Sequence, residues 1–178
     1  AAAEAFLAGF AQPDIRIASF RNAFFPYIGA EIKDYFERLK AEISPDVVFT
    51  HHRDDLHQDH RVIAEFTWNT FRNHLIAEYE IPKYDGGLTS PNMFVPISAE
   101  AARRKVEILM DCFGSQRSKR WFTPDTFYAL MRLRGVESNA PGGHAEGFHC
   151  RKAVLDLAPV ANGAKEKARR HAAPVPVA

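Results

Sequence analysis

Apolar positions along the chain alternate between the spacing of amphipathic helices and the spacing of strands. One helix is predicted where Ile32, Tyr35 and Leu39 fall on a single face. The same spacing, together with capping signals, predicts helices over residues 1–11, 30–43, 59–75, 98–113 and 123–135. Short apolar or alternating runs predict strands over residues 15–20, 47–49, 76–82, 93–95 and 148–155.

Strand and helix alternate along most of the chain, which predicts an α/β domain with a mostly parallel sheet and flanking helices. The run over residues 47–49 is short, apolar and rich in valine, so we expect a strand that is buried on both faces. Residues 1–157 form a single predicted domain. Residues 158–178 are rich in Ala, Pro and basic side chains, a composition typical of a disordered tail.

Composition and charge narrow the classes of function. The 178 residues carry 23 Lys and Arg against 22 Asp and Glu, a formal net charge of +1. Binding to nucleic acid or to an anionic membrane surface requires a basic excess on one face, so we expect neither partner. No apolar run is long enough for a transmembrane helix, and no signal peptide is recognisable. Only two cysteines are present, Cys112 and Cys150, which favours a reducing, cytoplasmic location.

Candidate chemistry is concentrated in one segment. Four of the eight histidines lie within residues 51–60, between a predicted strand and a predicted helix. Ligands of open α/β sheets bind at the carboxyl ends of strands, and imidazole nitrogens and carboxylate oxygens are ligands of zinc. His57 and His60 project to one side of the first helical turn. The aspartates of the segment are available as ligands, as acceptors for a ligating histidine, or simply as solvated helix caps: Asp54, Asp55 and Asp59.

One stretch of this segment carries a family resemblance. Residues 45–61, PDVVFTHHRDDLHQDHR, resemble the second signature of the PIG-L/LmbE-like zinc-dependent N-deacetylases, usually written with a His-Pro-Asp-His core. Gln58 replaces the proline of that core. Weaker matches follow in the family's order: Arg103-Arg104-Lys105, Ser115-Gln116, Arg134-Gly135 and Ala145-Glu146-Gly147-Phe148. Together they cover most of residues 1–155, and the resemblance implies a Rossmann-like fold.

The resemblance also implies an activity. Members of the family remove an acetyl group from an N-acetylated sugar or sugar conjugate, and an N-acetylglucosaminyl-type substrate is therefore expected. In that family the second histidine of the core binds zinc, which points to His60. The first polarises the carbonyl and stabilises the oxyanion, which points to His57, and Asp59 is expected to pair with it. Zinc, or another divalent metal, would activate the attacking water at neutral pH.

The chain departs from the family at one point. The family's N-terminal His-x-Asp-Asp motif supplies two more zinc ligands and the general base, and it does not precede the signature here. The letters recur in residues 52–55, but inside the signature, so no role is transferred. Because one imidazole cannot hold a catalytic zinc, we expect that the first strand is missing. The alternative is a non-catalytic or truncated remnant of the fold that lacks a complete metal site. A third hypothesis is a phosphoesterase whose complete site consists of His52, Asp55, His57 and His60.

Two further residues are predicted to bind substrate. Arg21 lies in a loop, residues 21–29, that follows a predicted strand and borders the same cleft. Glu146 belongs to the Ala-Glu-x-Phe element, where a structural hydrogen bond and a substrate contact are equally compatible with the sequence. Whether the active form is a homo-oligomer is left open.

Overall fold

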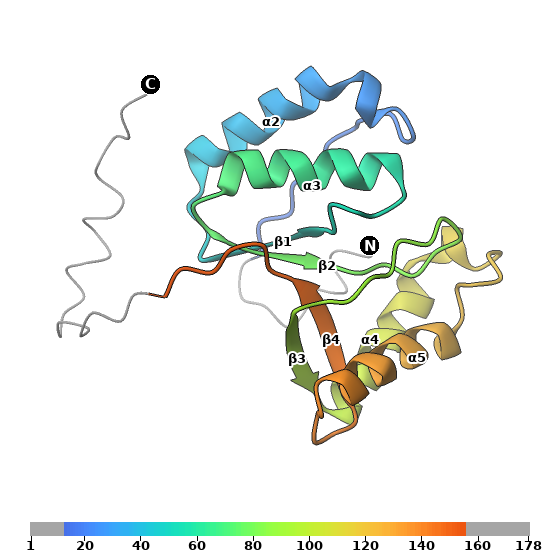
Figure 1. Cartoon of the computed structure of the whole chain (residues 1–178). Coiled ribbons are helices and arrows are strands. Elements are labelled where there is room, and N and C mark those ends of the chain that lie inside the picture. Colours follow the sequence, from blue (N-terminus) through green and yellow to red (C-terminus); the bar gives the residue numbers. More distant parts are fainter. Residues whose placement is uncertain (1–12, 156–178) are drawn as a thin grey trace.

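Four strands form a single sheet in the computed structural model, which describes residues 13–155. The sheet order is β1-β2-β4-β3 (Figure 1). The strands are β1 (Val47–His51), β2 (Leu75–Tyr79), β3 (Met93–Ile97) and β4 (His144–His149). β1 and β2 pair in parallel, with Val47 opposite Leu75 and His51 opposite Tyr79. β4 pairs antiparallel with both of its neighbours.

The helices lie in two groups (Figure 1). α2 (Gly29–Glu42) packs on α3 (Gln58–Phe71), which covers β1, whereas α5 (Pro124–Glu137) packs on β4 and on α4 (Ala99–Cys112). Two short 3-10 turns, η1 (Phe25–Tyr27) and η2 (Gly114–Gln116), precede α2 and follow α4. The hydroxyls of Ser98 and Thr123 accept N–H bonds and so cap α4 and α5. No helix within residues 13–155 has the length and apolarity needed to cross a membrane.

The α/β fold is confirmed, while the sheet is more mixed than expected. Three strands run in one direction, but β4 lies between β2 and β3 and runs the other way, so only one of the three neighbouring pairs is parallel. The bounds of the final strand also differ from the prediction, since β4 covers residues 144–149 rather than 148–155. The predicted helix over residues 1–11 and the predicted tail over residues 158–178 lie outside the described residues.

Two expectations about strands were wrong. Residues 15–20 form no strand, because alternation of side chains produces one only where a neighbouring strand supplies hydrogen bonds, and the described residues offer none there. The run at the start of β1 is not buried on both faces. β1 is an edge of the described sheet, and Phe49 is 60% exposed on the face opposite α3.

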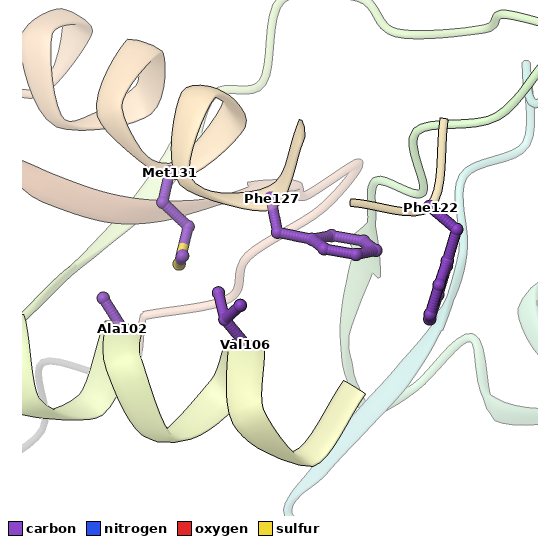
Figure 2. Close-up of a cluster of buried hydrophobic side chains, with 5 residues drawn as sticks. All are labelled: Ala102, Val106, Phe122, Phe127 and Met131. Carbon is purple, nitrogen blue, oxygen red and sulfur yellow. The ribbon is translucent and has the colours of Figure 1, made fainter. Parts of the chain in front are cut away.

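The main apolar core lies between α4 and α5. Figure 2 shows Ala102 and Val106 of α4 facing Phe127 and Met131 of α5, with Phe122 at one end. The rings of Phe122 and Phe127 meet edge to face, with their centroids 5.2 Å apart. This core packs α4 against α5, and the loop between them, residues 113–123, lines a cavity together with residues 80–83, which follow β2.

Gly135 permits the close approach of α5 to the turn before β4. A Cβ atom at this position would lie 2.2 Å from the carbonyl oxygen of Gly143. Alanine normally stabilises a helix interior relative to glycine, but here it would collide with backbone. We expect Gly135→Ala to lower the free energy of unfolding by about 1–3 kcal/mol, the cost typical of overpacking, in urea denaturation.

Gly114→Ala is the matched control for this prediction. Gly114 has no atom within 4 Å of the added Cβ, so this variant should be near neutral. Equal stability of the two variants would show that the approach of α5 to Gly143 is not tight.

Candidate active site

The histidine-rich segment forms the turn between β1 and α3. His51 ends β1, and His57 precedes the first residue of α3 in an extended conformation. Asp55 organises this turn, because its Oδ1 accepts the backbone N–H of His57 at 2.8 Å and its own N–H donates to the carbonyl of His52. The guanidinium of Arg61 donates to the carbonyls of Asp55 and Leu56, which closes the turn against the helix.

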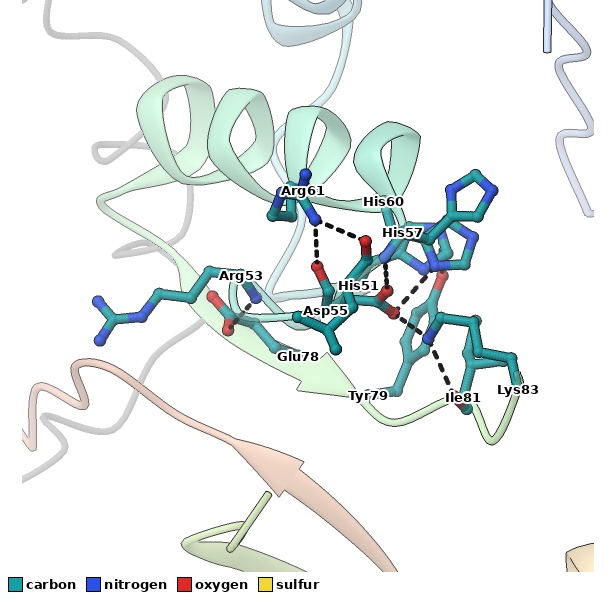
Figure 3. A network of polar contacts seen from close by, with 11 residues as sticks. His51, Arg53, Asp55, His57, His60, Arg61, Glu78, Tyr79, Ile81 and Lys83 are labelled. Atoms are coloured by element: carbon teal, nitrogen blue, oxygen red, sulfur yellow. Dashed lines mark hydrogen bonds and ion pairs between the residues drawn. The ribbon is translucent and has the colours of Figure 1, made fainter. Parts of the chain in front are cut away.

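A buried hydrogen-bonded chain joins three side chains at this turn. Oδ2 of Asp55 lies 2.9 Å from Nδ1 of His60 and 2.6 Å from Nζ of Lys83. Figure 3 shows the ammonium of Lys83 reaching this carboxylate from the loop after β2, while His60 approaches from α3. The side chains of Asp55 and Lys83 are only 4% and 8% exposed. The ion pair is therefore part of the interior.

The protonation state of Asp55 determines which ring nitrogen of His60 carries the proton. Burial opposes ionisation, but the hydrogen bonds from Lys83 and His60 prevail and lower the pKa of the Asp55 carboxyl below its ordinary value. An ionised carboxylate can only accept, so Nδ1 of His60 must carry the proton. In the neutral imidazole, Nε2 of His60 is then the nitrogen with a free lone pair. A carboxylate behind a histidine is the usual support of a metal-ligating imidazole.

His51 completes a set of three donors. Its ring stacks on the ring of His60, with centroids 3.9 Å apart and planes 9° apart. His51, Asp55 and His60 each offer one ligand atom, and these atoms all lie within 4.8 Å of one another. Burial, followed by the neighbouring His60, lowers the pKa of His51 to about 4, so its imidazole is neutral at pH 7. Its Nδ1 is buried and without a hydrogen-bond partner among the described residues. The residues present thus fit a divalent cation.

His57 lies beside this set, but Asp59 serves another segment. The ring of His57 is 4.5 Å from that of His60, and its Nδ1 is buried without a partner within residues 13–155. The carboxylate of Asp59 accepts the backbone N–H groups of Ala23 at 2.6 Å and Phe25 at 3.2 Å. No hydrogen bond between Asp59 and His57 occurs in the described structure. Asp59 instead ties the loop before α2 to the start of α3.

The imidazole cluster opens onto a cavity of about 760 Å³. His51, His57, Asp59 and His60 line one end of it, and Lys83 lines its wall. The opposite wall comes from α4, α5 and the loop between them. A cavity of this size at the carboxyl ends of β1 and β2 is the expected place for a ligand in an α/β sheet.

The two predicted substrate residues do not line this cavity. The guanidinium of Arg21 is exposed and lies over the ring of Phe24, 3.5 Å from its centroid. Glu146 forms an ion pair with Lys105, and it is Lys105 that lines the cavity. Glu146 thus makes a structural hydrogen bond to Lys105, and its contact with substrate stays a prediction.

The four side chains of the phosphoesterase hypothesis do not converge. The buried ring of His52 stacks on that of His149, 3.7 Å away. Both line a separate cavity of about 400 Å³ from which His57 and His60 are absent. Successive residues of a strand point to opposite faces, so the side chains of His51 and His52 lie on opposite faces of the sheet at the end of β1. That hypothesis was wrong.

Lys83 and Tyr79 are site residues that the sequence did not reveal. Tyr79 packs its ring against His51, with its hydroxyl 3.4 Å from Nε2 of that residue, because the parallel register places the two side by side. A sequence reading that paired β1 with β2 could have found Tyr79. Lys83 lies in an irregular loop, and no spacing pattern marks it.

Asp55→Asn tests whether the carboxylate supports a metal ligand. The amide cannot hold the Nδ1 proton of His60 as strongly as the carboxylate does, so we expect the zinc affinity of the full chain to fall by about 10–100-fold. Isothermal titration with zinc measures the change. Asp54→Asn, at an exposed neighbouring position, is the control and should leave the affinity unchanged. Equal affinity in both variants would contradict the support role.

Comparison with known proteins shows which solved structures share the fold of this chain. No protein-family model and no curated protein matches the chain. The structure resembles the zinc-inhibited form of teicoplanin deacetylase Orf2, with a TM-score of 0.54 and 14% identity over 79% of this chain and 57% of that one. It also resembles N,N'-diacetylchitobiose deacetylase from Pyrococcus horikoshii, with a TM-score of 0.55 and 17% identity over 84% of this chain and 61% of that one.

A third similar structure is an enzyme of another class. GalB, the 4-carboxy-2-hydroxymuconate hydratase from Pseudomonas putida KT2440, gives a TM-score of 0.53 and 14% identity over 86% of this chain and 72% of that one. Identities this low establish the fold alone. The Rossmann-like α/β fold of these deacetylases is thus confirmed, and the chain spans less than two thirds of the length of both deacetylases.

Proposed function

We propose that this chain, with the fold of these deacetylases, belongs to a metal-dependent hydrolase that removes an acetyl group from an N-acetylglucosaminyl-type substrate. The observation that carries the proposal is the buried Asp55–His60 pair, which turns a free imidazole nitrogen toward a cavity at the carboxyl end of β1. The resemblance of residues 45–61 to the deacetylase signature and the fold shared with two deacetylases support it. A reducing, cytoplasmic location is part of the same proposal.

Each side chain of the cluster has a role in this proposal. Of the three donors, His60, through Nε2, and His51 are assigned as ligands, while Asp55 orients His60. A bound zinc or other divalent ion would make a water molecule nucleophilic at neutral pH. His57 is placed to donate a hydrogen bond to the carbonyl oxygen as negative charge develops on it. Asp59 holds the loop at residues 23–25 at the border of the cavity.

Zinc titration and acetate release test the proposal together. We expect the full chain to bind zinc stoichiometrically and to release acetate from N-acetylglucosaminides, with activity lost to a chelator and restored by zinc. The alternative, a remnant of the fold with an incomplete metal site, predicts neither zinc binding nor acetate release. Zinc binding without acetate release from any N-acetylated sugar would reject the deacetylase and keep the metal site.

Hydration is the second candidate, because GalB shares the fold over more of its own length than either deacetylase does. A hydratase adds water to a carbon–carbon double bond, so it would release no acetate. The loss of ultraviolet absorbance of an unsaturated tricarboxylic acid such as 4-carboxy-2-hydroxymuconate distinguishes the two. Turnover of that acid in the absence of acetate release would favour hydration.

A further inference from the structure

The cavity continues well beyond the imidazole cluster. Its lining also includes six apolar side chains, called here the apolar arm: Leu109, Phe113, Trp121, Phe122, Phe127 and Leu130. Leu109 comes from α4, Phe127 and Leu130 come from α5, and the remaining members come from the connection between the two helices. The arm is therefore built on the α4–α5 unit, whereas His51 and His60 come from β1 and α3.

The inner end of the arm is continuous with the core. Phe122 and Phe127 are buried and belong to the cluster shown in Figure 2. Trp121 packs edge to face on both rings, at 5.4 Å and 6.4 Å between centroids. Contacting aromatic rings thus extend from the interior of the α4–α5 unit to the cavity.

The outer end of the arm is left in water. Phe113 is 42% exposed, and Tyr84, which stands at the rim with its ring 6.4 Å from that of Trp121, is exposed as well. The hydroxyl of Tyr84 accepts the backbone N–H of Arg120 at 2.9 Å, which fixes the ring in place. Large apolar side chains that are held rigid and exposed within a cavity gain free energy when an apolar ligand covers them.

The volume of the cavity agrees with a second ligand group. About 760 Å³ lies in the upper part of the range of roughly 300–1,000 Å³ that is usual for drug-sized ligands. A single acetamido sugar at His57 and His60 would occupy only the polar end. Polar side chains also line this part of the cavity, among them Gln116, Lys119 and Lys105, and Lys105 is paired with Glu146.

We propose that the apolar arm is a binding site for an apolar aglycone, an alkyl or aryl group attached to the sugar that carries the acetamide. The substrate is then an amphipathic glycoside, with its acetamide at the imidazole cluster and its apolar group against Phe113 and Trp121. This inference rests on the proposed function for the identity of the sugar end. Binding of the apolar group itself does not depend on hydrolysis of the acetamide.

Binding of octyl β-D-glucoside, which carries no acetamide, tests the arm independently of catalysis. The chain has two tryptophans, so Trp68→Phe leaves Trp121 as the single reporter of tryptophan fluorescence. We expect a saturable change in emission with octyl glucoside below its micelle concentration and none with methyl β-D-glucoside. Phe113→Ala should weaken octyl glucoside binding by about 10-fold, as expected for partial loss of a buried aromatic contact.

Tyr27→Ala is the control, because Tyr27 is an even more exposed aromatic residue, 76% against 42% for Phe113, and does not line the cavity. It should leave octyl glucoside binding unchanged. Acetate release from N-acetylglucosamine and from octyl N-acetylglucosaminide separates this inference from the proposed function. Octyl glucoside binding that Phe113→Ala weakens, without acetate release, supports the arm and rejects the deacetylase. Equal acetate release from both substrates, with no octyl glucoside binding, overturns the arm and keeps the deacetylase.

Discussion

Replacing His60 with alanine is expected to abolish stoichiometric zinc binding and to lower acetate release by more than about 100-fold. Loss of a residue that only supports a ligand usually costs 10–100-fold in metal affinity or activity, so loss of the ligand itself should cost more. The ring of His60 is the one that Asp55 orients, and it lies between the rings of His51 and His57. Zinc titration and acetate release, measured on the same preparation, give both quantities.

His144→Ala is the control for the loss of an imidazole. His144 begins β4, and its Nδ1 contacts the carbonyl of Gly142, outside the cavity that the cluster lines. This variant should keep both zinc binding and activity. Thermal unfolding of both variants checks that the fold is intact. Full zinc affinity in a folded His60→Ala variant would remove the basis of the proposed metal site.

Replacing Arg134 with methionine is expected to lower the free energy of unfolding by about 3–5 kcal/mol. Arg134 forms a two-pronged ion pair with Glu80, with N–O distances of 2.6 Å and 2.7 Å, and donates to the carbonyl of Thr89. The two side chains are only 8% and 4% exposed. Methionine keeps much of the apolar stem but leaves the carboxylate of Glu80 buried without a counterion, and that uncompensated charge carries the cost.

Urea denaturation measures this loss, with Arg103→Met as the matched control. Arg103 also pairs with two carboxylates, Glu100 and Glu107, but all three side chains are more than half exposed. Exposed pairs contribute about 0–1 kcal/mol, so the control should change stability little. A loss of less than 1 kcal/mol in Arg134→Met would mean that Glu80 finds water or another partner when the guanidinium is removed.

Local sequence signals were sufficient for most helices and for the position of the site. The caps Ser98 and Thr123 mark the starts of α4 and α5, and both predicted helices are confirmed to within a few residues. The histidine-rich segment lies between a strand and a helix, as its composition and neighbours predict. These features depend on residues a few positions apart, whose preferences act before any tertiary contact forms.

Local sequence signals could not predict the contacts between residues that are distant in the sequence. The sequence shows that Asp59 stands two residues after His57, which makes their pairing plausible. In the fold, the start of α3 directs Asp59 toward the backbone of residues 23–25 instead. In the same way, Phe49 reads as a core residue but lies 60% exposed, because burial depends on which elements cover a face of the sheet.

The sequence by itself determined the helices α2 to α5, the α/β class and the place of the imidazoles at the end of β1. Periodicity, capping and strand-to-helix order are properties of neighbouring residues. Only the tertiary structure decided the insertion of β4 between β2 and β3, the separation of His52 from His51 and the arrival of Lys83 at Asp55. The physical reason is that strand pairing and buried ion pairs join residues tens of positions apart. Their free energy depends on the whole packing of the chain rather than on any local pattern.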